Sequence, residues 1–84
     1  MYKAKVFVSL KPDVMDPQGQ TIRSALGTFG YTDVNRVEVG RYFVLTFDKK
    51  DRTRVEEDVK KIAHDILSNP VIEIFSYDIE EVQE

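Results

Sequence analysis

The chain has 84 residues, enough for one small domain over residues 1–84, and a compact chain of that length has a radius of gyration of roughly 12 Å. An apolar fraction of 42% argues against wholesale disorder, and the lack of cysteine excludes disulfides, thiolate zinc sites and cysteine nucleophiles. Twelve basic residues against 15 acidic ones argue against a nucleic-acid-binding protein. Charges interrupt the first residues and no apolar run approaches a membrane span, so we expect a cytoplasmic protein.

The first predicted element is a half-buried strand over residues 2–10, because apolar and other residues alternate there. Its core face carries Ala4, Val6, Val8 and Leu10.

A helix is predicted next, beginning at Asp16-Pro17. Aspartate is a strong N-cap, and proline suits the first helical position because its missing N–H would have no partner there. Ile22, Ala25, Leu26 and Phe29 form one apolar stripe, and Gly30 is the expected stop. Gly19 lies inside this helix at a cost in stability, so either something approaches the backbone there or tertiary packing holds the helix.

The second half predicts two strands, 34–40 and 42–48, with a tight turn at Gly40-Arg41. Asp51 can cap a helix over 52–68, and a last strand follows over 71–79. The buried stripe of that helix is expected to be Val55, Val59, Ile62, Ala63, Ile66 and Leu67. The order βαββαβ predicts an α+β, ferredoxin-like fold in which two helices cover one face of a four-stranded antiparallel sheet.

The second face of that sheet should be polar if it meets water, but it is not. Large apolar side chains fall on both faces of the third and last strands, and a surplus on adjacent strands marks a partner interface. We therefore predict a dimer that forms sheet to sheet. Its candidate face comprises Phe7, Tyr42, Val44, Ile72 and Ile74.

No catalytic, cofactor-binding or metal-binding residue is assigned. His64 is the single histidine and points to solvent on the helical wheel, and neighbouring carboxylates such as Glu56 and Glu57 splay apart. The turn over residues 17–20 could bind an anion through free N–H groups, but one glycine is a weak signal. An RNA-recognition module of the same fold is disfavoured because the third strand departs from its aromatic motif at Arg41 and Thr46.

Several segments resemble the PurS family, the small subunit of bacterial and archaeal phosphoribosylformylglycinamidine (FGAM) synthase. The similarity begins with residues 5–12 and 14–19, which read KVFVSLKP and VMDPQG, and continues through residues 26–31 and 67–73. The stretches Asp-Pro-Gln-Gly and Asn-Pro-Val-Ile-Glu are its most specific parts. Met15 stands where a leucine is usual.

The resemblance implies a non-catalytic subunit of a glutamine-hydrolysing C–N ligase in purine (IMP) biosynthesis. In that family a homodimer bridges the glutaminase PurQ and the synthase PurL and supports ammonia transfer. The sequence leaves open whether two such dimers pair into a tetramer. The complex converts formylglycinamide ribonucleotide (FGAR) to the amidine with ATP and glutamine. ATP and Mg²⁺ belong to the large synthase subunit, so this chain is expected to bind no cofactor.

Two segments are the candidate contacts with the larger subunits, because an exposed helix start with a small glycine suits close approach. The candidate residues are Asp16, Pro17, Gln18, Gly19, Asn69, Pro70 and Glu73. We expect Gly19→Trp and Asn69→Arg to leave folded dimers that fail to assemble. The alternative function is a small dimeric regulatory domain of the same fold that binds a metabolite.

Overall fold

The computed structural model describes residues 1–48 and 51–83. Its elements are strand β1 (Tyr2–Leu10), helix α1 (Pro17–Thr28), strand β2 (Gly40–Phe47), helix α2 (Arg52–Ile62), the π-helical turn η1 (Ala63–Leu67) and strand β3 (Glu73–Glu81). The three strands form one antiparallel sheet in the order β2-β1-β3. The fold is α+β as expected, but its element order is βαβαβ and the sheet has three strands.

The expected strand over 34–40 is wrong. Residues 34–39 have irregular backbone, and Gly40 is the first residue of β2, where it pairs with Ser9 instead of forming a turn with Arg41. Two backbone groups of this segment bond to α1 and to its N-cap residue. Arg23 donates to the carbonyl of Val34 at 3.3 Å, and the N–H of Val39 bonds to Asp16 at 2.9 Å.

The core lies between the sheet and α2. Ala4, Val6 and Val8 of β1 are buried against Val55 and Val59 of α2. The partly buried side chains around them come from β2, η1 and β3 and are Phe43, Leu45, Phe47, Leu67, Phe75 and Tyr77. The odd-numbered side chains of β3 therefore face the core, and Ile74 lies on the other face.

The helix expected over 52–68 changes its hydrogen bonding after Ile62. The N–H and hydroxyl of Ser68 both bond to the carbonyl of Ala63, at 3.0 and 2.7 Å, closing the wider turn η1. Ala63 is buried, whereas Ile66, which we expected in the buried stripe, is 74% exposed. The last strand begins at Glu73 rather than Val71.

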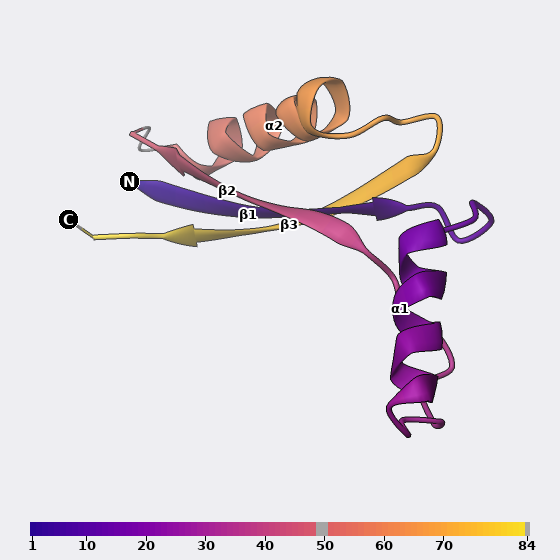
Figure 1. Ribbon diagram of the computed structural model, residues 1–84. Coiled ribbons are helices and arrows are strands. Elements are labelled where there is room, and N and C mark those ends of the chain that lie inside the picture. Colours follow the sequence, from indigo (N-terminus) through magenta and orange to yellow (C-terminus); the bar gives the residue numbers. More distant parts are fainter. Residues whose placement is uncertain (49–50, 84) are drawn as a thin grey trace.

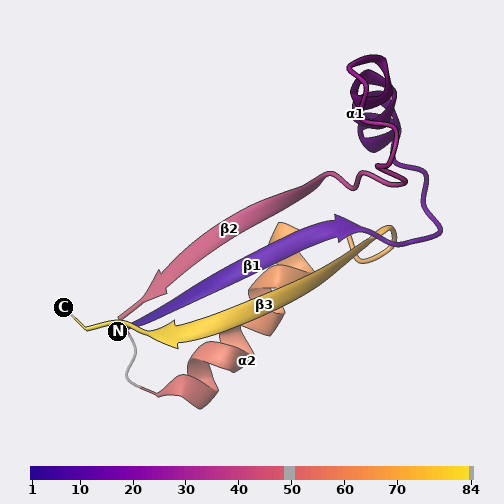
Figure 2. The same cartoon turned by 90° about the horizontal axis from the view of Figure 1, so that it is seen from below.

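The expectation that both helices cover one sheet face is also wrong. Figure 1 shows α2 lying along one face, while α1 projects from one end of the sheet toward the opposite side. In Figure 2, seen from below, α1 stands beyond β2. The molecule measures 49 × 30 × 14 Å, and its radius of gyration of 16.4 Å exceeds the roughly 12 Å of a compact chain of this length. The chain is therefore an open, L-shaped body with one bare sheet face.

Candidate subunit interface

Asp16 joins the start of α1 to the segment before β2. One carboxylate oxygen accepts the N–H of Gly19 and the other accepts the N–H of Val39, each at 2.9 Å. These bonds, from Val39 first and Gly19 second, hold the pKa of Asp16 below its ordinary value, and the nearby positive charge of Arg36 adds to the effect. The predicted N-cap is confirmed. The N–H of Gly19, which an external anion could have used, is already bonded within the chain.

Gly19 is buried because the chain's own backbone approaches it. A Cβ at this position would lie 2.1 Å from the carbonyl oxygen of Val37. The close approach is thus internal, and the large side chain of a Gly19→Trp variant would collide with the carbonyl of Val37, so this variant would disturb the fold as well as any subunit contact. Pro17 and Gln18 are exposed beside it. In the first candidate segment, Asp16 and Gly19 hold α1 against residues 37–39, and only Pro17 and Gln18 face outward.

The corner over residues 69–73 is ordered by hydrogen bonds around Asn69. Its carbonyl accepts the N–H groups of Ile72 and Glu73, and its side-chain oxygen accepts the N–H of Val71 at 3.1 Å. The N–H of Asn69 in turn donates to the Glu73 carboxylate at 2.7 Å. Pro70 and Val71 are left exposed on this rigid corner.

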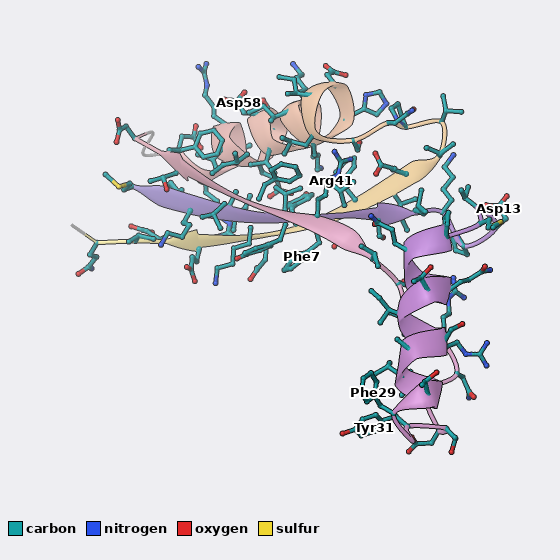
Figure 3. The ribbon with its side chains drawn as sticks, in the orientation of Figure 1. Phe7, Asp13, Phe29, Tyr31, Arg41 and Asp58 are labelled. Carbon is teal, nitrogen blue, oxygen red and sulfur yellow. The ribbon has the colours of Figure 1, made fainter. Side chains whose placement is uncertain are left out.

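Arg41 is a residue that the sequence reasoning missed. It was read as part of a turn, but its guanidinium contacts both carboxylate oxygens of Glu73, at 2.7 and 2.8 Å, and lies 5.9 Å from the centre of the Phe43 ring. The Glu73 side chain is only 15% exposed. This pair ties β2 to the start of β3 across β1. Figure 3 shows Arg41 on the α2 side of the sheet.

The two candidate segments lie at the same end of the sheet. β1 ends there, β2 and β3 begin there, and the N–H of Lys11 bonds to the carbonyl of Ile72 at 2.8 Å. A hollow of about 390 Å³ lies at this end between the loop after β1, α1 and residues 35–39. Its charged groups are partly satisfied internally, since Arg36 pairs with Glu38 at 2.8 Å.

The predicted apolar face exists, and we call it the sheet patch: Phe7, Tyr42, Val44, Ile72 and Ile74. All five side chains are between 39% and 53% exposed. The rings of Phe7 and Tyr42 stack with centroids 4.8 Å apart, and Figure 3 shows Phe7 on the side away from α2. At the other end of this face charges replace apolar groups, with Lys5 3.7 Å from Glu80. The patch thus has a polar rim on one side.

A second apolar surface is exposed, and it includes Ile22 and Phe29 of the helix stripe that was expected to pack on the sheet. Ile22, Phe29 and Tyr31, which we call the arm stripe, are 43%, 80% and 60% exposed. The Asp16 cap and the apolar spacing predicted the position of α1 correctly, but they could not show which surface α1 packs against. Ile22 and Val39 line a shallow hollow in the angle between α1 and the start of β2. The sheet patch and the arm stripe are the apolar surfaces that we describe on the side of the sheet opposite α2.

Acid–base or metal chemistry finds little support in the geometry. His64 is exposed and bonds to the adjacent Asp65 at 2.8 Å. Over residues 1–48 and 51–83 no three His, Cys, Asp or Glu side chains lie close enough to hold a metal ion. The same ranges hold no helix long and apolar enough to cross a membrane.

Comparison with known sequences gives one consistent family. A model of the family described as PurS, phosphoribosylformylglycinamidine (FGAM) synthase, matches residues 3–81. The PurS subunit of Bacillus subtilis is 45% identical over 82 residues, which cover 98% of this chain and 96% of that one. The PurS subunit of Methanocaldococcus jannaschii is 31% identical over 83 residues, covering 99% of this chain and all of the other.

Solved structures agree with the sequences. The B. subtilis PurS structure superposes with a TM-score of 0.86 at 44% identity, covering 96% of this chain and 100% of that one. A PurLQS structure from Thermotoga maritima contains a chain with a TM-score of 0.86 at 26% identity, covering 94% of this chain and 96% of the other. Family model, curated relatives and solved structures all cover nearly the whole chain. The chain therefore belongs to the PurS family, the subunit family of FGAM synthase that takes part in purine biosynthesis.

Proposed function

We propose that this chain is a non-catalytic structural subunit of FGAM synthase that acts as a homodimer. The observation that carries the proposal is the sheet patch, five exposed apolar side chains on a domain with one bare sheet face. Surfaces of this kind on small soluble domains mark protein–protein contacts. Membership of the PurS family supports the same role.

In this proposal the dimer bridges the glutaminase and synthase subunits and supports ammonia transfer between them. The T. maritima PurLQS structure supports it, because a chain of this fold occurs there in a structure named for all three subunits. Conversion of FGAR to FGAM, with ATP and Mg²⁺, takes place on the large synthase subunit. This chain contributes surfaces and binds no cofactor.

The corner over residues 69–73 is our proposed contact with a larger subunit. Its hydrogen bonds already hold Pro70 and Val71 outward in the free chain. Binding of a partner would therefore cost this corner little conformational entropy. Val71→Arg should leave the corner intact, since Val71 contributes its backbone N–H rather than its 76% exposed side chain. The matched control is Gln83→Arg at the opposite end of the sheet.

Reconstitution tests the function. Glutamine-dependent FGAM synthesis by the purified glutaminase and synthase should require this chain, and ammonia-dependent synthesis by the synthase should not. Val71→Arg should lower the glutamine-dependent rate and Gln83→Arg should not. Full glutamine-dependent activity without the chain would refute the bridging role. Saturable binding of a metabolite by the isolated chain would favour a regulatory domain instead.

A further inference from the structure

Hydrogen bonds, rather than buried side chains, hold the corner over residues 69–73 in shape. The side chains of residues 69–72 are all exposed, and that of Glu73 is 15% exposed. Residues 69–72 belong neither to η1 nor to β3. A segment with few buried apolar contacts and exposed backbone opens easily unless its hydrogen bonds are kept. The position of Val71, the proposed contact residue, therefore depends on those hydrogen bonds.

The Glu73 carboxylate closes this corner. Its Oε1 accepts the N–H of Asn69 at 2.7 Å, and the N–H of Glu73 donates to the carbonyl of Asn69, also at 2.7 Å. The first and last residues of the corner are thus bonded to each other twice. The side chain of Asn69, held in this way, accepts the N–H of Val71 at 3.1 Å. A Glu73 side chain that turned away would therefore loosen Asn69 and, through it, Val71.

Arg41 fixes the direction of the Glu73 side chain. Its Nη2 donates to both carboxylate oxygens, at 2.7 and 2.8 Å, and its guanidinium lies 5.9 Å from the centre of the Phe43 ring. In the sheet Arg41 pairs with Val8 and Glu73 pairs with Leu10, so the two side chains meet across β1. β2 and β3 are two strand spacings apart, roughly 9–10 Å, which only a long side chain can span.

This ion pair affects the corner more than the stability of the fold. The Arg41 side chain is 54% exposed and is not part of the core cluster, and an exposed ion pair contributes little to the free energy of unfolding. The Glu73 carboxylate is mostly buried, so without Arg41 its charge would be better solvated if the side chain turned toward water. That movement would break the bond to Asn69 and release the corner.

We propose that Arg41 is a positioning residue for glutamine-dependent FGAM synthesis. It holds the Glu73 carboxylate, the carboxylate holds the corner, and the corner presents Val71 to a larger subunit. The inference rests on the proposed docking of this corner and adds the residue that sets its shape in the free chain. Because a single nitrogen of Arg41 contacts both oxygens, a lysine ammonium could replace it, whereas a glutamine side chain is too short to reach across β1.

Titration of the chain into purified glutaminase and synthase tests the proposal, with the glutamine-dependent rate as the readout. We expect Arg41→Gln to raise the chain concentration that gives half of the maximal rate by about 10-fold or more. The maximal rate at saturating chain should stay within about 2-fold of wild type, because only docking is weakened. Arg41→Lys should remain within about 3-fold of wild type in both quantities.

The matched control is Arg54→Gln, which removes the same charge from the exposed surface of α2, on the same side of the sheet as Arg41. It should leave the half-maximal concentration within about 2-fold of wild type. An equal rise for Arg54→Gln and Arg41→Gln would show that the charge of this side matters rather than the shape of the corner, and would overturn the proposal.

Amide hydrogen exchange of the free chain separates positioning from general destabilisation. In Arg41→Gln the N–H of Asn69 should exchange about 10-fold faster or more, whereas that of Val6, in the central strand, should stay within about 3-fold of wild type. Arg41→Lys should restore the slow exchange at Asn69. Equal acceleration at Asn69 and Val6 would mean that Arg41 only stabilises the fold, and would overturn the proposal.

A double-mutant cycle with Val71→Ala separates positioning from direct contact. If Arg41 acts through the corner, Arg41→Gln should raise the half-maximal concentration less in the Val71→Ala chain than in wild type. The full effect in both backgrounds would mean that Arg41 itself contacts the subunit, which overturns positioning and leaves the subunit function standing. Fast exchange at Asn69 with an unchanged half-maximal concentration would overturn the contact at this corner. Full glutamine-dependent activity without the chain would refute the subunit function itself.

Discussion

Gly19 and Gly27 look alike in the sequence, since both are glycines inside one short helix, but their surroundings differ. Gly19 faces the carbonyl oxygen of Val37, which a Cβ would meet at 2.1 Å, whereas nothing lies within 4 Å of a Cβ at Gly27. The sequence indicated that a glycine here had either a close neighbour or tertiary support. It could not name the neighbour, because Val37 is distant along the chain and belongs to a segment with no regular structure.

These two glycines make a matched pair for substitution. Gly19→Ala should lower the free energy of unfolding by roughly 1–3 kcal/mol, because the methyl group forces the backbone of residues 36–38 away from α1. Gly27→Ala should raise it by about 0.5–1 kcal/mol, since alanine favours the helix and meets open space. Urea denaturation measures both. Equal effects of the same sign would contradict the close approach at Gly19.

Asp16 has a pH dependence whose sign follows from its hydrogen bonds. Its pKa in the folded chain lies below the ordinary value of 3.8, so the carboxylate stabilises the fold above that pH and loses this effect as pH falls through the lower folded pKa. Asn at this position has one acceptor oxygen and can keep only one of the bonds to Gly19 and Val39.

We therefore expect Asp16→Asn to melt at a lower temperature than wild type near neutral pH. The gap between the two melting temperatures should shrink from about pH 4 to about pH 2, as the wild-type carboxyl becomes protonated. Thermal denaturation across this range measures it, and an NMR titration of the carboxyl gives the folded pKa directly. A difference in melting temperature that grows toward low pH would contradict a lowered pKa for Asp16.

At the scale of elements, local signals located helices and strands better than they located contacts. β1 was predicted over 2–10 and is found there, and α1 begins at its Asp16 cap. It ends where expected: Gly30 has φ of +94°, and the N–H groups of Gly30 and Tyr31 bond back to the carbonyls of Gly27 and Leu26. These features depend on a few neighbouring residues. The strand expected over 34–40 failed because a strand also needs a partner, and α1 takes that segment's hydrogen bonds instead.

The α2 stripe offers a test at this scale. Val59 and Ile66 were both expected to be buried, but Val59 is fully buried and Ile66, within the π-helical turn, is mostly exposed. Val59→Ala should cost about 1.5–3 kcal/mol of unfolding free energy, because it leaves a cavity against β1. Ile66→Ala should change it by less than about 0.5 kcal/mol. Chemical denaturation measures the free energy of unfolding of both variants. A larger loss of unfolding free energy for Ile66→Ala than for Val59→Ala would contradict the described end of α2.

For the whole molecule, the important feature is that the chain leaves one face of its sheet uncovered. The sheet has α2 on one face and α1 stands beyond β2 (Figures 1 and 2). The exposed side chains of the sheet patch are on β1, β2 and β3 or just before β3. The alternation of apolar residues predicted the sheet patch correctly, because strand periodicity assigns each side chain to a face. The same kind of pattern predicted Ile22 and Phe29 as core, because helical periodicity shows that a stripe is apolar without showing what it packs against.

Small-angle X-ray scattering tests this openness. A monomeric variant such as Val44→Asp should keep a radius of gyration near 16.4 Å, since hydrogen bonds to residues 34–39 hold α1 away from its own sheet. The wild-type dimer measured beside it is the control for association. A value near 12 Å for the monomer would mean that α1 folds back onto the bare sheet face, and would contradict the projecting position of α1.

The amino-acid pattern was enough for the α+β class, the limits of β1 and α1, the composition of the sheet patch and the resemblance to PurS. Each of these depends on residues close together in the chain or on a repeating two-residue or 3.6-residue period. The number of strands, the direction of α1, the pairing of Arg41 with Glu73 and the exposure of Ile22 came only with the folded chain. They depend on contacts between distant residues, where a hydrogen bond such as Asp16 to Val39 determines which surface stays open.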